Sequence, residues 1–247
     1  MFLAVDLETI PATETVGLWK GDPDKDFPPI HAHAIVCLGW ALVSEFPRTE
    51  ISQVGCWSAR NPGEERQILQ SFGGLWDACK NHKLKCTLVT WNGRVFDVPV
   101  LQSRALKHRV PLPFTWEKDF RDRYSQTSHL DLKDFVSNYG AASGYHLDTV
   151  AKIVNLPGKM DVSGSDVKEM FWAGRLTEIA DYCMCDVIQT SLVLMHIQYA
   201  KGLLSLPDPY LSIQNSLNAT STLPANFEQV QKLVTKVHTE ELSVSIG

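Results

Sequence analysis

The 247-residue chain is predicted to fold as an α/β protein in which a mixed central sheet is flanked by helices. Short apolar runs with strand character come early in the chain, and longer segments with helical spacing dominate its later part. The early strands are consecutive and separated by turn-forming residues, which favours an antiparallel start to the sheet. The several helices that follow in the chain are expected to cover both faces of that sheet.

The strands are identified by short apolar stretches bounded by turn signals. A loop rich in Pro, Asp and Gly follows the first of them, and Asn92-Gly93 ends the last. The segments predicted as strands are 2–7, 34–43, 51–57 and 86–91.

The helices are identified by apolar residues that recur every three or four positions. Pro99 is expected near the start of one of them, because first-turn N–H groups have no intrahelical partner to lose. A loop is expected over 111–128. The segments predicted as helices are 62–80, the stretch that begins near Pro99, 132–138, 147–155, 167–172, 178–199 and 226–238.

Composition and charge limit the domain organisation and the class of protein. With 44% hydrophobic residues, the chain has enough apolar surface for one sizeable core. Residues 1–204 are predicted to form one domain, and 205–247 a C-terminal extension, part helical, that packs on it. The formal charge of −5 argues against a protein that coats nucleic acid through a broad cationic surface. Any grip on nucleic acid is therefore expected to be local.

The cysteine pattern and the absence of apolar spans indicate a reduced, cytoplasmic environment. The six cysteines form no CxxC pair, which argues against a structural zinc site. The N-terminus lacks the basic region of a signal peptide, and no apolar run approaches the roughly 20 residues of a membrane span. No membrane association is expected, and the pattern names no protein partner.

Two acidic residues, Asp6 and Glu8, lie at the end of the first predicted strand. Alternation along a strand sends residues i and i+2 to the same face, so both carboxylates point one way. Two carboxylates beside an apolar run repel each other unless a cation neutralises them. Hard divalent cations such as Mg²⁺ or Mn²⁺ prefer ligands of this kind, although the DxE pattern alone also fits an exposed strand end.

Two further acidic positions fall at places that suit the same chemistry. Asp97 follows a later strand at a junction with a helix, near the sheet edge where open α/β folds keep their sites, although a helix cap is an alternative role. Asp186 lies in an apolar helical stretch where an unpaired charge would be costly. Tyr182 precedes it by four residues and therefore shares its helix face, whereas Asp181 is expected on the exposed polar stripe.

Taken in order, these motifs resemble those of the DEDD 3′→5′ exonucleases, in the branch whose third motif carries tyrosine. The resemblance is narrower to bacterial predicted exonucleases related to the exonuclease domain of family B DNA polymerases, and it covers most of residues 1–200. The resemblance implies an RNase H-like fold. The stretches that carry it are AVDLETI, TWNGRVFDVPVLQSRALKH, HLDLKDF, LPGK and YCMCDVIQT.

The resemblance implies a role for each acidic position. Two divalent cations, Mg²⁺ or Mn²⁺, are expected on the four carboxylates: Asp6 bridges them, Glu8 and Asp186 bind one, and Asp97 binds the other. Tyr182 is expected to orient the attacking water, because an unperturbed tyrosine with a pKa of about 10 is a poor base at neutral pH.

The resemblance and the positions of nearby residues also predict substrate contacts. Thr9 and Ile10 are expected to contact the last nucleotide, and Lys159 to reach the nucleic-acid substrate. Asn92 and Arg94 are expected to support Asp97 and to contact the phosphates. Two supporting residues complete these expectations: Asp131 as a helix cap or a support for the acidic cluster, and His33 as a structural residue.

The expected activity is release of mononucleotides from the free 3′ end of single-stranded nucleic acid, with DNA favoured. An exoribonuclease of the same fold is the first alternative, because no residue announces contact with a 2′-OH. A binding-only accessory subunit for proofreading is the second. Four converging carboxylates argue against it, because binding alone does not need them.

Overall fold

A five-stranded mixed sheet forms the centre of the computed structural model, which describes residues 1–12, 14, 18–22, 26–44, 50–81, 85–158, 164–203 and 227–244. Its strand order is β3-β2-β1-β4-β5. The first three strands in the chain pair antiparallel, and β4 and β5 extend the sheet in parallel, so the predicted mixed sheet with an antiparallel start is confirmed. The strands are β1 (Phe2–Pro11), β2 (His33–Ser44), β3 (Glu50–Ser58), β4 (Thr87–Thr90) and β5 (His129–Asp131).

The predicted helices are present, and the region 111–128 holds short helical pieces where a loop was expected. The strand β5 was not predicted, because three residues carry too little periodic signal. No helix in the described part of the chain combines the length and apolarity needed to cross a membrane. The helices are α1 (Glu65–Asn81), α2 (Asp97–His108), α3 (Lys118–Arg121), α4 (Leu132–Val136), α5 (Leu147–Ile153), α6 (Val167–Trp172), α7 (Leu176–Ala200) and α9 (Glu228–Val244), with short 3₁₀ turns at Ile30–Ala32, Pro62–Glu64, Pro113–Trp116 and Gly164–Asp166.

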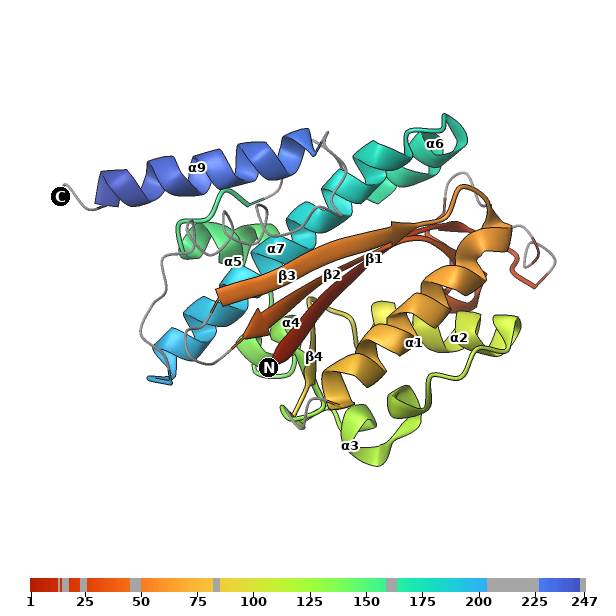
Figure 1. The fold of residues 1–247 in the computed structure, drawn as a ribbon, viewed down its shortest axis with the longest axis horizontal. Helices are drawn as coiled ribbons and strands as arrows, with labels where there is room; N and C mark the ends of the chain where they lie inside the picture. The colour runs from red at the N-terminus through yellow and green to blue at the C-terminus, as the bar shows by residue number, and fades with distance from the viewer. Residues whose placement is uncertain are drawn as a thin grey trace.

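Helices cover both faces of the sheet, as predicted. The long helix α7 runs along one face, with α9 outside it, whereas α1 and α2 lie against the other face (Figure 1). Along β1, Leu3, Val5 and Leu7 point into the apolar cluster beneath α1 and α2. The alternate residues Ala4 and Ile10 belong to the cluster beneath α7. By the period of two, Asp6 and Glu8 therefore lie on the α7 face.

Gly39 of β2 permits the close approach of α7 to the sheet. It is the cross-strand partner of Asp6. A Cβ atom at this position would lie 2.9 Å from Sγ of Cys183 and 3.0 Å from Cγ2 of Val187. A side chain at this position would therefore crowd Cys183 and Val187, so glycine suits the contact between β2 and α7.

A buried ionic network holds α2 against α1 and β2. Glu65, which is fully buried, accepts a hydrogen bond from the backbone N–H of Ile35 at 2.7 Å. Its carboxylate also accepts from Nε and Nη2 of Arg104 at 2.7 and 2.5 Å, and from Nε2 of His108 at 2.6 Å. Because a buried charge must be paired, this carboxylate restricts where α2, and hence Asp97 at its start, can lie.

The C-terminal helix α9 docks on α7 through one carboxylate, and the expectation of an exposed Asp181 is wrong. Asp181 is only 3% exposed. Its two oxygens accept hydrogen bonds from the N–H groups of Gln229 and Val230 at 2.7 and 2.9 Å, so it caps the first turn of α9. Apolar residues of α9 then join the cluster beneath α7: Val230, Leu233 and Val234, with Phe227 just before the helix.

Substituting Asp181→Ala should loosen α9, because two helix N–H groups would lose their acceptor in a buried place. We expect the free energy of unfolding to fall by about 1–2 kcal/mol, as for other lost caps. The amide protons of 229 and 230 should also exchange faster. Denaturant unfolding and hydrogen exchange measure the two effects, with Glu178→Ala as the control because Glu178 pairs with Arg175 at the surface. An unchanged exchange rate at both amides would contradict the capping role.

Candidate metal centre

The first two predicted acids lie at the open end of β1. Glu8 is 7% exposed and Asp6 is half-buried. The pairing of β1 with β4 covers only Phe2 to Ala4, so the later part of β1 has a free edge on that side. On the other side, the register with β2 shifts between Glu8 and Thr9. Such bulges are common beside active sites, because they redirect a strand locally.

Asp97 reaches this free edge from the start of α2. The backbone N–H of Leu7, beyond the part of β1 that pairs with β4, donates a hydrogen bond to the Asp97 carboxylate. Asp97 is 4% exposed, and its Oδ1 is buried with no hydrogen-bond partner among the residues that the structure describes. A buried carboxylate oxygen without a partner is costly, so this position is suited to an additional ligand.

Asp131 holds the turn that presents Asp97. Its carboxylate accepts from the backbone N–H groups of Asn92 and Arg94 at 3.0 and 2.9 Å. The same carboxylate accepts from Lys133 and Asp134 in the first turn of α4, so the predicted cap is confirmed. Asn92 has a φ of 65°, a left-handed conformation that asparagine tolerates better than most residues.

Tyr182 and Asp186 reach the site from α7. They are one helical turn apart, and the Tyr182 hydroxyl is hydrogen-bonded to the Asp186 carboxylate. Tyr182 is 8% exposed. The thiol of Cys183 donates toward the backbone carbonyl of Asp6 at 3.5 Å and toward its Oδ2 at 3.8 Å. Ligand atoms of Asp6, Glu8 and Cys183 all lie within 4.8 Å of one another.

The electrostatics of the site follow from burial and mutual repulsion. Burial, together with the charges of Asp97, Glu8 and Asp186, raises the pKa of Asp6 well above its usual value. Burial, followed by the charges of Asp186 and Asp97, does the same to the pKa of Glu8. Four carboxylates from three segments therefore converge closely enough to oppose one another's ionisation.

Burial also raises the pKa of Asp97, to about 7. The pKa of Tyr182 is raised above its usual range, first by burial and then by the charge of Asp186. Tyr182 is therefore a neutral phenol at physiological pH, able to donate and accept hydrogen bonds but unable to act as a phenolate.

The residues present fit divalent cations. Carboxylate oxygens are the ligands that hard cations prefer, and the unpartnered Oδ1 of Asp97 is one such atom. A bound cation would also relieve the repulsion that raises the pKa values of Asp6 and Glu8. The four carboxylates on which this fit rests are Asp6, Glu8, Asp97 and Asp186.

The structure places the residues that were predicted to contact the substrate in different surroundings. The Thr9 hydroxyl lies 2.9 Å from Nδ1 of His33, whose Nε2 lies 2.9 Å from the carbonyl of Pro28. The Nε2 proton must go to that carbonyl, so Nδ1 accepts from Thr9. Ile10 is 1% exposed within the core, which argues against a substrate contact by its side chain. Lys159 lies outside the described residues.

The Arg94 side chain braces the neighbouring loop. Its guanidinium donates to the backbone carbonyls of Phe120 at 3.2 Å, Ser125 at 3.3 Å and His129 at 2.5 Å. These bonds hold the segment 120–129 against the turn before Asp97. A contact between Arg94 and phosphate stays a prediction.

Sequence reasoning missed Cys183 as a neighbour of the acids. A single cysteine in an apolar helix is usually plain core, and only its place directly after Tyr182 hinted at the site. Contact with Asp6 depends on how closely α7 approaches the sheet, which a helical pattern does not specify.

Comparison with solved structures identifies the fold as RNase H-like. A family B DNA polymerase from the hyperthermophilic archaeon Pyrobaculum calidifontis matches with a TM-score of 0.54 and 21% sequence identity, over 93% of this chain and 26% of the polymerase. The chain thus spans about a quarter of the length of that polymerase. No curated protein matches the sequence.

The chain belongs to the family described as predicted 3′-5′ exonucleases related to the exonuclease domain of PolB, whose model matches residues 25–236. That match includes Asp97, Tyr182 and Asp186 and begins after Asp6 and Glu8.

The raised pKa of Asp97 gives the metal-free protein a defined pH response. Between 3.8 and about 7, the folded state keeps a proton on Asp97 that the unfolded state releases. This contribution to the stability of the folded state is fully present below pH 3.8, the pKa of Asp97 in the unfolded chain. It is lost as the pH rises toward about 7, the pKa of Asp97 in the folded protein. Asp97→Asn cannot ionise and should escape the loss.

Thermal unfolding with a chelator present, from about pH 4 to about pH 8, measures this response. The unfolding midpoint of the wild type should fall relative to that of Asp97→Asn as pH rises. The lowered pKa values of the buried His33 and His129 affect both proteins alike and cancel in the difference. The raised pKa values of Asp6 and Glu8 fall when the charge of Asp97 is removed, which changes the difference in the same direction. Parallel curves for the two proteins would rule out a raised pKa at Asp97.

Proposed function

We propose that this protein is a 3′→5′ exonuclease that releases mononucleotides from single-stranded nucleic acid, with DNA the favoured substrate. The observation that carries the proposal is the convergence of Asp6, Glu8, Asp97 and Asp186 from β1, α2 and α7 on one partly buried site. Membership of a family of predicted 3′-5′ exonucleases supports the same reaction. Binding nucleic acid without cutting it gives no reason to bring four carboxylates together.

Two divalent cations, Mg²⁺ or Mn²⁺, would be held by the four carboxylates. When bound, such ions activate the attacking water and relieve charge on the leaving 3′ oxygen. The protein's own contribution is to set the ligands in place before the substrate arrives. The turn braced by Asp131 fixes Asp97, and the close approach of α7 at Gly39 fixes Asp186.

Tyr182 would position the water that attacks the phosphodiester. Its phenol is neutral and lies beside Asp186, so it can hold a proton on its Oη and donate or accept one hydrogen bond. Thr9 would meet the terminal nucleotide. Because its hydroxyl proton is directed to His33, its oxygen is left as an acceptor for a donor such as a terminal 3′-OH.

The site by itself does not choose between DNA and RNA, so an exoribonuclease is the second candidate. The favoured substrate is single-stranded because the acidic chain lacks the broad cationic surface of a duplex binder. A site at the free edge of β1 would accept an unstacked end.

The decisive experiment follows the shortening of 5′-labelled linear single strands and the integrity of internally labelled circular ones, as DNA and as RNA, with Mg²⁺ or Mn²⁺ titrated. Linear strands should shorten from the 3′ end only with metal present, and circles should stay intact. Asp97→Ala and Asp186→Ala should each lower the rate about a thousandfold or more, because metal effects are worth several kcal/mol in the transition state.

Asp77→Ala is the matched control, since Asp77 is an exposed carboxylate on α1, and its rate should equal that of the wild type. No release from any linear strand at any metal concentration would overturn the proposed activity. Rapid cutting of a circle would overturn its exonucleolytic character.

Replacing Tyr182 by Phe tests the role of the hydroxyl alone. The ring that packs against the core is kept, so folding and metal affinity should hold. Single-turnover cleavage should slow roughly tenfold to a hundredfold, less than for a lost metal ligand, because one positioned hydrogen bond carries a smaller part of the barrier. Wild type, Tyr182→Phe and Asp186→Ala are compared at one saturating metal concentration. A Tyr182→Phe enzyme as fast as the wild type would remove the proposed role.

A further inference from the structure

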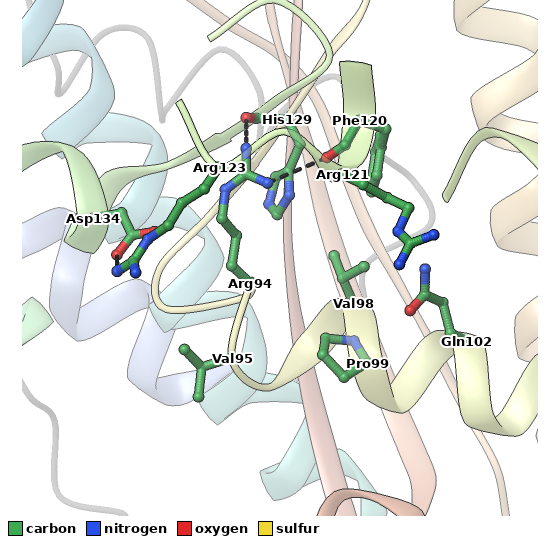
Figure 2. A pocket seen from close by; sticks show the side chains of 10 residues that line it. All are labelled: Arg94, Val95, Val98, Pro99, Gln102, Phe120, Arg121, Arg123, His129 and Asp134. Carbon is green, nitrogen blue, oxygen red and sulfur yellow. Dashed lines mark hydrogen bonds and ion pairs between the residues drawn. The ribbon is translucent and has the colours of Figure 1, made fainter. Parts of the chain in front are cut away.

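Two adjoining cavities form a groove along the turn that precedes Asp97. Their volumes are about 320 and 350 Å³, and both are lined by Val95, Arg123 and Asp134. The first lies between the start of α2, the end of α3 and β5, as Figure 2 shows. The second lies between Asn92 and the segment 137–146. We call the pair the edge groove. Asn92 and Val95 belong to the turn directly before Asp97, so the groove adjoins the turn that presents this acid.

The edge groove carries positive charge on an acidic protein. Its walls hold four cationic side chains against one carboxylate, Asp134. Among the residues that the structure describes, Arg121 and Lys133 have no carboxylate partner, and both lie at this groove. The other two cations are Arg94, which holds three backbone carbonyls, and Arg123, whose Nε and Nη2 lie 2.8 and 2.6 Å from the oxygens of Asp134. A net positive groove on a chain of charge −5 is complementary to a polyanion.

Apolar and aromatic side chains accompany these cations, either in the lining of the groove or directly beside a lining residue in the chain. Val95, at the junction of the two cavities, is 62% exposed. Tyr124, which follows Arg123, is 67% exposed, and its ring packs edge-on against Tyr139 with centroids 4.6 Å apart. Single-stranded nucleic acid needs both kinds of group, because its bases stack on aromatic rings while cations follow its phosphates. A simple anion would use the cations alone.

We propose that the edge groove binds the nucleotides upstream of the 3′ end, with Arg121 and Lys133 on the phosphates and Tyr124 beneath a base. This inference rests on the proposed exonuclease function and specifies how the substrate strand leaves the site. A strand held along the groove has its end delivered past Asn92 to Asp97. Affinity should then grow with strand length, whereas the chemistry at the last phosphodiester should not depend on the groove.

Binding without cleavage tests the groove independently of catalysis. Fluorescence anisotropy in EDTA would measure the affinity for a labelled single strand of about twelve nucleotides at several salt concentrations, as DNA and as RNA. For Arg121→Ala/Lys133→Ala, the slope of log affinity against log salt concentration should become shallower by about 1.4, because each phosphate contact with a single strand contributes about 0.7 to that slope. The control is Arg66→Ala/Lys236→Ala, which removes the same charges from exposed positions on α1 and α9.

Cleavage of strands of increasing length supplies the second readout. With the wild type, KM should fall from a dinucleotide to a strand of several nucleotides. In Arg121→Ala/Lys133→Ala, KM should no longer decrease with strand length, and kcat on the dinucleotide should equal that of the wild type. Tyr124→Ala should raise KM for long strands, and Tyr124→Phe, which keeps the ring, should restore it.

The outcomes separate the groove from the proposed function. A wild-type protein that cuts no strand refutes the exonuclease, while the anisotropy measurement still decides whether the groove binds. If the double variant matches the control in salt dependence and in length dependence, the groove proposal is overturned. A loss confined to DNA, or to RNA, supports the groove and identifies the sugar that it accepts.

Discussion

The structure depends on one constraint: the central strand β1 must be buried on both faces and yet carry two carboxylates near its end. Leu3, Val5 and Leu7 fill the space beneath α1 and α2, while Asp6 and Glu8 point toward α7. The pairing with β4 stops at Ala4, which leaves an edge where the acids need not compete with a neighbouring strand. Among the described residues, only the part of β1 after Ala4 has a paired strand on one side alone, and the polar site lies there.

The neighbouring elements are held by buried polar contacts that keep this end of β1 in shape. Glu65 binds Arg104 and so fixes α2, which presents Asp97. Asp181 fixes α9 on the outer side of α7, one residue before Tyr182. Each is a buried charge with its partners in place, whereas the acids of the site repel one another, and Oδ1 of Asp97 has no hydrogen-bond partner among the described residues. That contrast separates the residues that support the fold from those suited to a cation.

The turn between β4 and α2 links the acidic site to the surface around it. Asp131 holds its backbone, and Arg94 ties it to the segment 120–129. The same turn forms the junction of the edge groove through Val95. Rigid support beneath an exposed, cationic surface would let a flexible strand be guided without any movement of the ligands beside it.

The sequence by itself determined what depends on local periodicity. Alternation placed Asp6 and Glu8 on one face of a strand, helical spacing placed Tyr182 beside Asp186, and the order of segments predicted the mixed sheet. Only the tertiary structure decided that Cys183 touches Asp6, that Asp181 is buried as a cap, and that Ile10 is core. It also supplied β5, whose three residues are recognisable as a strand only through their pairing with β4. The physical reason is that these features depend on contacts between segments far apart in the chain, and the distance at which two elements pack is set by the side chains of both.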